Sequence, residues 1–329
     1  MQSMTDLIKE KNVLFITTKN IDYLRNTQEI RLIKDYSKSV DILYSEKKNN
    51  PLRILDVLGK IIRRKMNKYD VVFVGFEPQF VVPFVGKKFK NNTLIIDFFI
   101  SVYDTLICDR KKFKDGGLVS KICRRMDIKT IKLADYVITD TRAHADFFIK
   151  EFGGEKERFE TIYLEADSSI YYPREQKKTP EMKDKFTVLY FGSILPLQGV
   201  DVVLDAIREL NNRPEIYFDI IGPIPKQLNK PIQDNVSYTT WLSQEELAEH
   251  IAASDLCLAG HFCKDIEKAG RTIPGKAYIY EMMGKKMILG DGEANHELFK
   301  ADENHYFVER GNAKNLAGLI LEITEKNKN

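Results

Sequence analysis

DLCLAGHFCKDIEKAGRTIPGKAYIYEMMGKKMILGDGEANHELF, residues 255–299, predicts a strand, a polar loop, a helix, a second strand and a short helix. The apolar run 255–262 has the length of a buried strand, and Pro274 stands in the first turn of a helix that ends at Gly284. Proline is tolerated there because the amide hydrogen that it lacks would have had no partner. Two strands joined through a helix are the repeating unit of a parallel sheet.

Three cations, Lys268, Arg271 and Lys276, lie in the polar loop and at the start of this helix. A helix N-terminus carries amide hydrogens without partners and a partial positive charge. Cations at that end favour a phosphate or diphosphate ligand. Glu297, after the next strand, is a carboxylate suited to accept hydrogen bonds from hydroxyl groups. The alternative is an ordinary solvated surface loop.

The composition, 43% hydrophobic and 30% charged over 329 residues, is that of a globular protein with two domains. The four cysteines show no CxxC spacing, which favours reduced thiols over a zinc site or a disulfide framework. Charged residues precede the first apolar run, and the most apolar stretch, 71–86, is interrupted by Glu77 and Pro78. We therefore expect a cytoplasmic protein without a signal peptide or a membrane span.

The charge is unevenly distributed along the chain. Residues 1–172 hold 31 Lys and Arg against 24 Asp and Glu, a balance of +7, and residues 173–329 hold 20 against 24, a balance of −4. A basic N-terminal half favours an acidic partner, such as an anionic membrane surface or a phosphorylated substrate.

Apolar runs rich in β-formers alternate with helical periodicity along the whole chain. Strands are expected at 12–18, 40–45, 71–76, 93–99, 136–141, 186–192, 216–222, 235–240, 255–262, 285–291 and 305–309. Helices are expected at 51–66, 117–133, 142–152, 201–210, 243–254, 274–284 and 313–326, with weaker helical periodicity in 19–38. A polar stretch with two prolines, 168–180, is interpreted as an interdomain linker.

The sequence thus predicts two α/β domains, 1–172 and 173–329, each a doubly wound parallel sheet. Two such domains are expected to face each other across a cleft at the carboxyl ends of their strands. A dinucleotide fold is excluded because no GxGxxG follows a strand, and a P-loop is excluded because no GxxxxGK[ST] occurs. Gly192 and Gly199 bracket a loop whose backbone amides are candidates to meet a phosphate.

Four segments carry a resemblance to GT-B-fold retaining glycosyltransferases of glycosyltransferase family 4 (group 1). They are YFGSILPLQGVDVVLDAI, FDIIGP, WLSQEELAEHIAASDLCLAG and KAGRTIPGKAYIYEMMGKKMILGDGEANHELF, in the order and spacing of that family over 186–299. The N-terminal half is similar to the acceptor domain of these enzymes through IIDFFISVYDTLICDRKKF and ADYVITDTRAHADFF. Together the resemblance covers nearly the whole chain.

The chain departs from this family at two places. Ser193 and the pair Gln198-Gly199 stand where a basic residue and KG are common, and the paired glutamates would fall at Arg271 and Ile279. The basic IPxK loop resembles a branch found in bacterial surface-polysaccharide pathways. In that resemblance Lys268, Arg271 and Lys276 supply the missing cations and Glu297 binds donor hydroxyls.

The resemblance implies transfer of a sugar, as by a hexosyltransferase, from a nucleoside-diphosphate sugar to a glycan or lipid-linked acceptor, with retention. It implies no metal and no cofactor besides the nucleotide sugar as co-substrate, and no nucleic-acid partner. Charge on the departing diphosphate is stabilised by cations and helix amides. Expected catalytic residues are Lys268, Arg271 and Asp104. Expected donor-binding residues are Gly192, Ser193, Gln198, Gly199, Trp241, Lys276 and Glu297, and the acceptor side is expected at Asp97, Asp109, Arg110 and His144.

Structural alternatives stand beside several of these roles. Asp104 and Asp109 follow a strand and suit turns or helix caps. His144 suits a helix surface or cap, His261 a hydrogen-bonded structural role, and Trp241 a packed position at a strand end. The basic helical stretches 60–68 and 121–132 suit either anionic lipid or plain solvent.

Three function classes therefore stay open: an active glycosyltransferase on the inner face of the membrane or free in the cytoplasm, a non-catalytic GT-B subunit that binds a partner glycosyltransferase or a glycan, and another GT-B enzyme such as a sugar-nucleotide epimerase. The absence of the paired glutamates keeps the second class open. Release of free nucleotide without an acceptor would point to the third.

Overall fold

The computed structural model describes residues 3–327, which form two compact units, Met1–Leu164 and Glu165–Asn329. Each unit contains a six-stranded sheet in which every paired strand is parallel. We call them unit 1 and unit 2. The sequence places the boundary at residue 172, and in the structure the division falls after Leu164. Within residues 3–327 no helix has both the length and the apolar character needed to cross a bilayer.

Unit 1 has the strand order β2-β1-β3-β4-β5-β6. Its strands are β1 (Asn12–Ile16), β2 (Ser39–Leu43), β3 (Val71–Val74), β4 (Thr93–Asp97), β5 (Tyr136–Thr139) and β6 (Phe159–Thr161). Its α-helices are α1 (Met4–Ile8), α2 (Leu24–Tyr36), α3 (Asn50–Arg63), α4 (Val82–Val85), α5 (Leu118–Leu133) and α6 (Arg142–Phe152). Shorter turns of helix are η1 (Pro78–Phe80), η2 (Gly86–Phe89), the π-helix η3 (Asp104–Asp109) and η4 (Lys156–Arg158).

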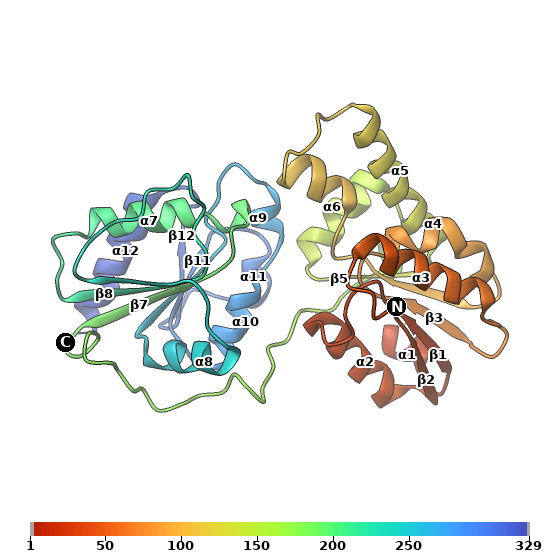
Figure 1. The fold of residues 1–329 in the computed structure, drawn as a ribbon, viewed down its shortest axis with the longest axis horizontal. Coiled ribbons are helices and arrows are strands. Elements are labelled where there is room, and N and C mark those ends of the chain that lie inside the picture. Colours follow the sequence, from red (N-terminus) through yellow and green to blue (C-terminus); the bar gives the residue numbers. More distant parts are fainter. Residues whose placement is uncertain (1–2, 328–329) are drawn as a thin grey trace. The chain divides into compact units, whose positions relative to one another are not determined.

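Two cores hold this sheet, one on each face. Helices α1 and α2 pack Ile8 and Ile33 against Phe15 and Phe73. On the other face α3, α4, α5 and α6 pack against the alternate side chains of the same strands, as Figure 1 shows. The strands are therefore apolar on both faces, which explains why they appear in the sequence as unbroken apolar runs.

Unit 2 has the strand order β12-β11-β10-β7-β8-β9. Its strands are β7 (Phe186–Phe191), β8 (Ile216–Ile221), β9 (Val236–Thr239), β10 (Leu256–Gly260), β11 (Met287–Gly290) and β12 (His305–Val308). Its helices are η5 (Pro196–Gln198), α7 (Val200–Glu209), α8 (Gln244–Ala253), α9 (Lys268–Arg271), α10 (Gly275–Met282), α11 (Asn295–Leu298) and α12 (Ala313–Lys326).

In unit 2, α7 and α12 cover one face of the sheet, and α8 and α10 lie on the other (Figure 1). The chain begins the sheet at β7, adds β8 and β9 on one side, and returns to add β10 to β12 on the other. The order therefore reverses between β7 and β10, and loops diverge at the carboxyl ends of these two strands. Open α/β sheets bind ligands at this position.

The polar stretch 168–180 connects the units but is bound along unit 2. Arg174 forms an ion pair with Glu245 (2.9 Å), and Gln176 donates hydrogen bonds to Ala253 O and to Asp255. Lys178 forms an ion pair with the same Asp255. This segment is therefore a strap held on α8 and the start of β10, and it belongs to unit 2, whereas the sequence predicts an interdomain linker.

All eleven predicted strands and all seven predicted helices are confirmed, including the Ser243–Glu246 capping box of α8. The sequence missed β6, α1, α4, the π-helix η3, α9 and the short turns η1, η2, η4 and η5, each six residues or shorter. Pro274 is the N-cap of α10 with an extended backbone, one position before the first helical turn where it was predicted. All four cysteines are free thiols, as predicted.

Candidate functional site

The loop after β7 is closed by the side chain of Gln198. Its Oε1 accepts hydrogen bonds from Ser193 N and from the Tyr190 hydroxyl, both at 3.1 Å, and its Nε2 donates to Ser193 Oγ at 3.2 Å. A Cβ at Gly192 would lie 2.2 Å from Gln198 Oε1, so any side chain there would displace the Gln198 amide. Four predicted donor-binding positions, Gly192, Ser193, Gln198 and Gly199, therefore form one compact turn.

Glycines bring the neighbouring loops into backbone contact at this edge of the sheet. Gly199 has a φ of +66°, and a Cβ there would lie 2.6 Å from Phe262 C. Gly290, at the end of β11, would place a Cβ 1.9 Å from His261 O. Phe262 N donates to Gln198 O at 3.2 Å. The loops after β7, β10 and β11 thus form one continuous floor beside the point where the strand order reverses.

Lys276 stands in the first turn of α10, and its amine is buried in this floor. The residue is 5% exposed, and Nζ lies 3.9 Å from the centroid of the Tyr190 ring without a hydrogen-bond partner in the described chain. Burial lowers the pKa of this amine from 10.5 to about 7. An amine held this way is able to gain a proton when an anion arrives.

His261 lies beside Lys276, directly after β10. Burial, with the nearby charges of Lys276, Lys268 and Arg310, lowers the pKa of His261 to about 3, so its ring is neutral. Its Nδ1 is buried without a hydrogen-bond partner among residues 3–327. The expectation of a hydrogen-bonded structural histidine is therefore wrong.

Arg310 is a cation at this site that the sequence analysis missed. It follows β12, and its guanidinium donates to Asp291 O at 3.0 Å and to Cys263 O at 3.4 Å. A Cβ at Gly270 would lie 3.1 Å from Arg310 Nη2, so the guanidinium packs against helix α9. Its position after a strand end is the signal that was available, because the carboxyl ends of all parallel strands meet at one edge.

Lys268 and Arg271 are the first and last residues of α9. Arg271 forms an ion pair with Glu267 at 3.2 Å, and Glu267 itself is 91% exposed. Ala294 N donates to Gly270 O at 3.0 Å, which joins α9 to the turn that begins α11 and carries Glu297. The three cations and Glu297 therefore belong to the same edge of unit 2.

Trp241 stands apart from this cluster. It follows β9, the edge strand two positions away from β7, and it is 76% exposed. The alternative of a packed aromatic at a strand end is therefore wrong, and the ring is available to a ligand.

In unit 1, the carboxyl ends of β4 and β5 bring together His144, Asp140 and Asp104. His144 Nδ1 lies 2.8 Å from Asp140 Oδ1, and its Nε2 lies 3.9 Å from Asp104 Oδ2. His144 and Asp104 are both fully buried, and the His144 ring packs 4.0 Å from the ring of Phe148. Thr141 caps α6 instead, so a surface or capping role for His144 is wrong.

Asp97, at the end of β4, is fully buried in a charged cluster. Arg25 donates to its two oxygens at 3.1 and 3.0 Å, and Glu29 Oε1 lies 3.4 Å from Arg25 Nε. Burial, and secondarily the charge of Asp97, raises the pKa of Glu29 well above 4.5. One guanidinium thus lies beside two carboxyl groups, and the protonated form of Glu29 is favoured relative to a free glutamate.

Asp109 and Arg110 end the π-helix η3, with Asp109 buried and Arg110 exposed. Burial raises the pKa of nearby Glu77, while the charges of Lys19 and Arg110 act in the opposite direction. Glu77 follows β3 with a φ of +54°, which is uncommon for a side chain other than glycine. The sequence analysis missed Glu77, Lys19 and Asp140, although Glu77 and Lys19 follow predicted strands and Asp140 lies at the end of one.

The comparisons with known proteins agree with this architecture. Residues 185–326 match the family model described as glycosyl transferases group 1. A chitobiosyldiphosphodolichol beta-mannosyltransferase of Candida albicans is 24% identical over 216 residues, which cover 58% of this chain and 46% of that protein. The chain thus spans about half the length of this curated relative.

Solved structures resemble the whole chain. HepE of Anabaena, in complex with UDP and glucose, has a TM-score of 0.63 at 14% identity, covering 97% of this chain and 91% of that one. Sucrose-phosphate synthase of Thermosynechococcus elongatus has a TM-score of 0.69 at 12% identity, with 97% and 90% covered. WaaG, a glycosyltransferase involved in lipopolysaccharide biosynthesis, has a TM-score of 0.59 at 14% identity, with 96% and 91% covered.

Two Rossmann-like α/β units, and the likeness to these structures along nearly the whole chain, define a GT-B fold. Within unit 2, residues 185–326 match the model of the glycosyl transferases group 1.

Proposed function

We propose that the protein is a glycosyltransferase that takes a sugar from a nucleoside-diphosphate sugar bound on unit 2. The observation that carries this proposal lies at the sheet edge between β7 and β10, where glycines let the loops pack closely together. There the buried amine of Lys276 has no hydrogen-bond partner in the described chain. A diphosphate would supply that partner, and the group 1 match covers this same edge. HepE, with the same fold, is seen with UDP and with UDP-glucose.

The proposed donor site divides its tasks among the residues already described. The turn Gly192–Gly199 and Lys276 hold the diphosphate, and Lys268 and Arg271 stabilise the charge that grows on it. Glu297 accepts hydrogen bonds from sugar hydroxyls, and Trp241 offers its exposed ring to the base. No metal ion and no further cofactor is included in this proposal.

The acceptor is proposed to be a glycan or a lipid-linked sugar that contacts unit 1. Asp104 and His144 are the proposed catalytic and acceptor-side pair, with Asp97, Asp109 and Arg110 around them. The bond between the anomeric carbon and the diphosphate oxygen breaks, and the acceptor oxygen bonds to the same carbon on the same face. The configuration at this carbon is therefore retained, and the acceptor proton passes to the departing diphosphate.

The cellular role proposed is the synthesis of bacterial cell-surface polysaccharide or glycoconjugate, in the cytoplasm or on the inner face of the membrane. The +7 balance of residues 1–172 supports a site near an anionic membrane. The likeness to WaaG supports a polysaccharide pathway at the level of fold alone.

A thermal-shift screen against UDP, GDP, ADP and CMP, with the corresponding sugar nucleotides, tests the donor site. A ligand present at about one hundred times its Kd stabilises the fold by about 2.7 kcal/mol, so one nucleotide is expected to raise the Tm. Arg271→Ala and Lys268→Ala should each lower the affinity for that nucleotide by about tenfold or more, because each removes a charge-assisted contact.

Lys183→Ala is the matched control, because Lys183 is exposed at the opposite end of β7. It should leave the nucleotide shift unchanged. No shift with any nucleotide would refute the active-transferase proposal and favour the second candidate, a non-catalytic GT-B subunit. That candidate is kept because Arg271 and Ile279 stand where the family's paired glutamates would fall.

A further inference from the structure

Helix α3 carries two different stripes on its solvent side. Leu52, Leu55 and Ile62 form an apolar stripe and are 56%, 64% and 62% exposed. Asp56, Lys60 and Arg63 form a charged stripe about 90° around the helix axis, at about 100° per residue. The core-facing positions, Val57 and Ile61, are fully buried, so the apolar stripe is additional to the face that the fold needs.

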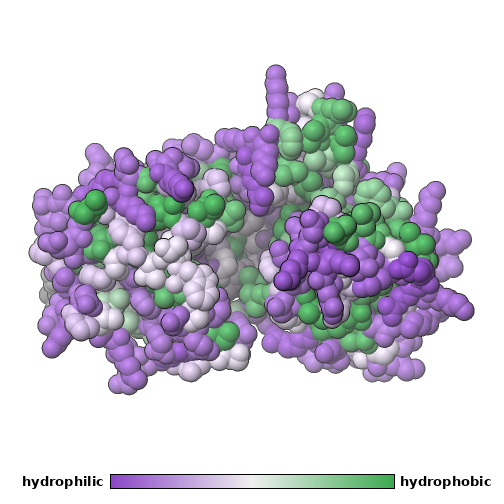
Figure 2. All heavy atoms as spheres, in the orientation of Figure 1, coloured by the Kyte–Doolittle hydropathy of each residue, from purple (hydrophilic) through white to green (hydrophobic). Residues whose placement is uncertain are grey.

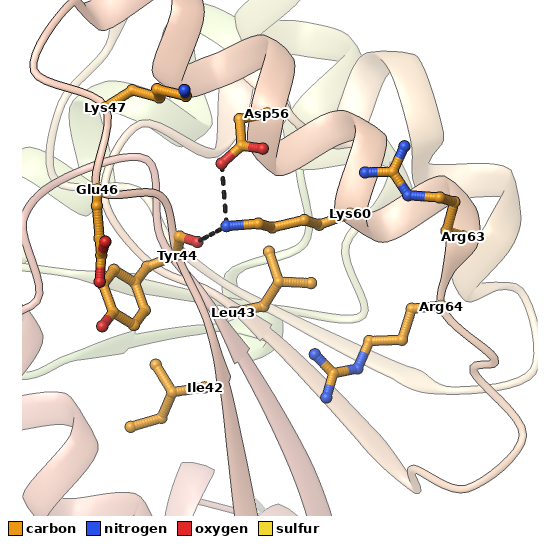
Figure 3. Close-up of a pocket in the computed structure, with 9 residues that line it drawn as sticks. All are labelled: Ile42, Leu43, Tyr44, Glu46, Lys47, Asp56, Lys60, Arg63 and Arg64. Carbon is orange, nitrogen blue, oxygen red and sulfur yellow. Dashed lines mark hydrogen bonds and ion pairs between the residues drawn. The ribbon is translucent and has the colours of Figure 1, made fainter.

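The charged stripe forms one wall of a pocket of 890 Å³ between α3 and the edge strand β2 (Figure 3). Its lining includes four cations and two carboxylates: Lys47, Lys60, Arg63, Arg64, Glu46 and Asp56. Lys60 forms an ion pair with Asp56 and donates a hydrogen bond to Tyr44 O, both at 2.9 Å, and Arg64 forms an ion pair with Asp41 at 3.0 Å. Arg63 makes no hydrogen bond or ion pair with any residue of 3–327 that the structure describes.

Two other helices on the same face of the sheet also expose large apolar side chains. Lys88 donates to Ile61 O at 2.8 Å, which fastens the end of α3 to the segment after α4, and Lys129 of α5 donates to Pro83 O of α4 at 2.7 Å. Phe84 of α4 is 64% exposed and Leu118 of α5 is 75% exposed. Figure 2 shows hydrophobic and hydrophilic side chains intermixed over this part of unit 1.

This combination differs from an ordinary solvated face. A helix that exposes a bulky apolar stripe beside a cationic stripe is suited to lie in a lipid interface, with the apolar side in the acyl boundary and the cations at the phosphates. Helix α2, on the other face of the same sheet, shows the contrast, because Tyr36 is its one large apolar side chain above one-third exposure among the described residues.

We propose that α3 lies in the surface of an anionic membrane and that the α3–β2 pocket takes the phosphate of an anionic lipid headgroup. Leu52, Leu55 and Ile62 enter the acyl boundary, while Arg63 supplies a cation that has no hydrogen-bond or ion-pair partner among the described residues. The inference rests on the proposed function in one respect, because a lipid-linked acceptor would be found on this surface.

Vesicle co-sedimentation of the full chain tests the proposal. Binding should be strong to vesicles with about one third phosphatidylglycerol in phosphatidylcholine, weak to phosphatidylcholine alone, and reduced by salt. Arg63→Gln should lower the partition coefficient about fivefold, and Leu55→Ser about tenfold. Lys34→Gln and Tyr36→Ser, on α2, are the matched controls and should leave it within about twofold.

A further pair separates a headgroup pocket from diffuse attraction. Arg125 is an exposed cation of α5 outside the pocket. If Arg125→Gln and Arg63→Gln lower binding equally, the pocket is not a headgroup site; if Leu55→Ser has no effect, α3 does not enter the membrane. Either result overturns that half of the proposal, and absence of binding to anionic vesicles overturns the whole.

The nucleotide thermal shift keeps this result distinct from the donor-site proposal. Arg63→Gln and Leu55→Ser should show the wild-type nucleotide shift, which also reports that they fold. A protein that binds vesicles but no nucleotide would refute the proposed function and leave the membrane surface standing. The reverse result would refute the membrane surface alone.

Discussion

Lys276→Met is expected to make the protein more stable and, at the same time, to weaken its binding of a nucleoside diphosphate. The folded chain holds the amine at a pKa of about 7, whereas the unfolded chain holds it near 10.5. At pH 7 this difference costs the fold at most about 4 kcal/mol. The cation–π contact with Tyr190 returns about 2 kcal/mol, so the methionine variant should gain about 2 kcal/mol, or about 5 °C in Tm.

The sign of the pH dependence follows from the same two pKa values. Between pH 7 and 10.5 the unfolded chain binds a proton that the folded chain lacks, so the free energy of unfolding should rise with pH across this window. The cost is complete below pH 7 and absent above pH 10.5. In Lys276→Met this rise should disappear, which denaturant titrations at pH 6.5 and pH 9.5 would measure.

Nucleotide binding should move in the opposite direction. Loss of a charge-assisted contact is expected to lower the affinity for the diphosphate by about ten- to a hundredfold. In the parent protein, calorimetry at pH 8 in buffers of different ionisation enthalpy should detect proton uptake, because the anion raises the pKa of Lys276. Lys183→Met is the control. A lower Tm together with unchanged nucleotide affinity would contradict this account of Lys276.

Asp97→Asn should have the largest effect on stability in unit 1. It leaves the buried guanidinium of Arg25 without its bidentate carboxylate, and breaking one side of such a pair costs about 3–5 kcal/mol. The exposed carboxylate of Asp22, before α2, is the control, and Asp22→Asn should change stability by less than about 0.5 kcal/mol. Denaturant unfolding followed by circular dichroism measures both.

Glu29→Gln in the same cluster should behave in the opposite way. The pKa of Glu29 is raised above 4.5 in the fold, so the folded chain keeps a proton that the unfolded chain loses as pH increases. Stability of the parent protein should therefore fall from pH 4.5 upward, until the raised pKa is passed. Glutamine copies the protonated form, so this variant should lose that decline and be more stable than the parent at pH 8. A Glu29→Gln variant as damaged as Asp97→Asn would show that Glu29 is ionised.

The central strands of each sheet could be predicted because they are buried on both faces. Val71–Val74 and Tyr136–Thr139 are buried at every position, and such runs are visible without knowledge of their partners. β6 is three residues long and only Phe159 is buried, which leaves no apolar run to detect. The π-helix at Asp104 depends on the tertiary bonds of Ser101 with Asp127, 26 positions away in sequence.

The candidate site was predictable in its charges but not in its geometry. Lys276 was placed at a helix start from Pro274 alone, whereas its burial depends on Tyr190, which comes from another strand. His144 appeared as a surface residue because the polar side chains around it in the sequence do not reveal that Phe148 covers its ring. Arg310 was missed because its role comes from carbonyls of the β10 and β11 loops.

The strap formed by residues 168–180 determines where the chain could be cut to leave unit 2 intact. It supplies Tyr171, which is 3% exposed, and the partners of Glu245 and Asp255, and Met182 just after it packs on Tyr217 and Ala253. A fragment of unit 2 that begins at Phe186, where the first strand of its sheet starts, would lose this covering and expose an apolar patch at the amino end of that sheet. A fragment that begins at Glu165 keeps this covering, so proteases should not cleave within the strap. The boundary between the two units therefore lies upstream of every residue in the family match.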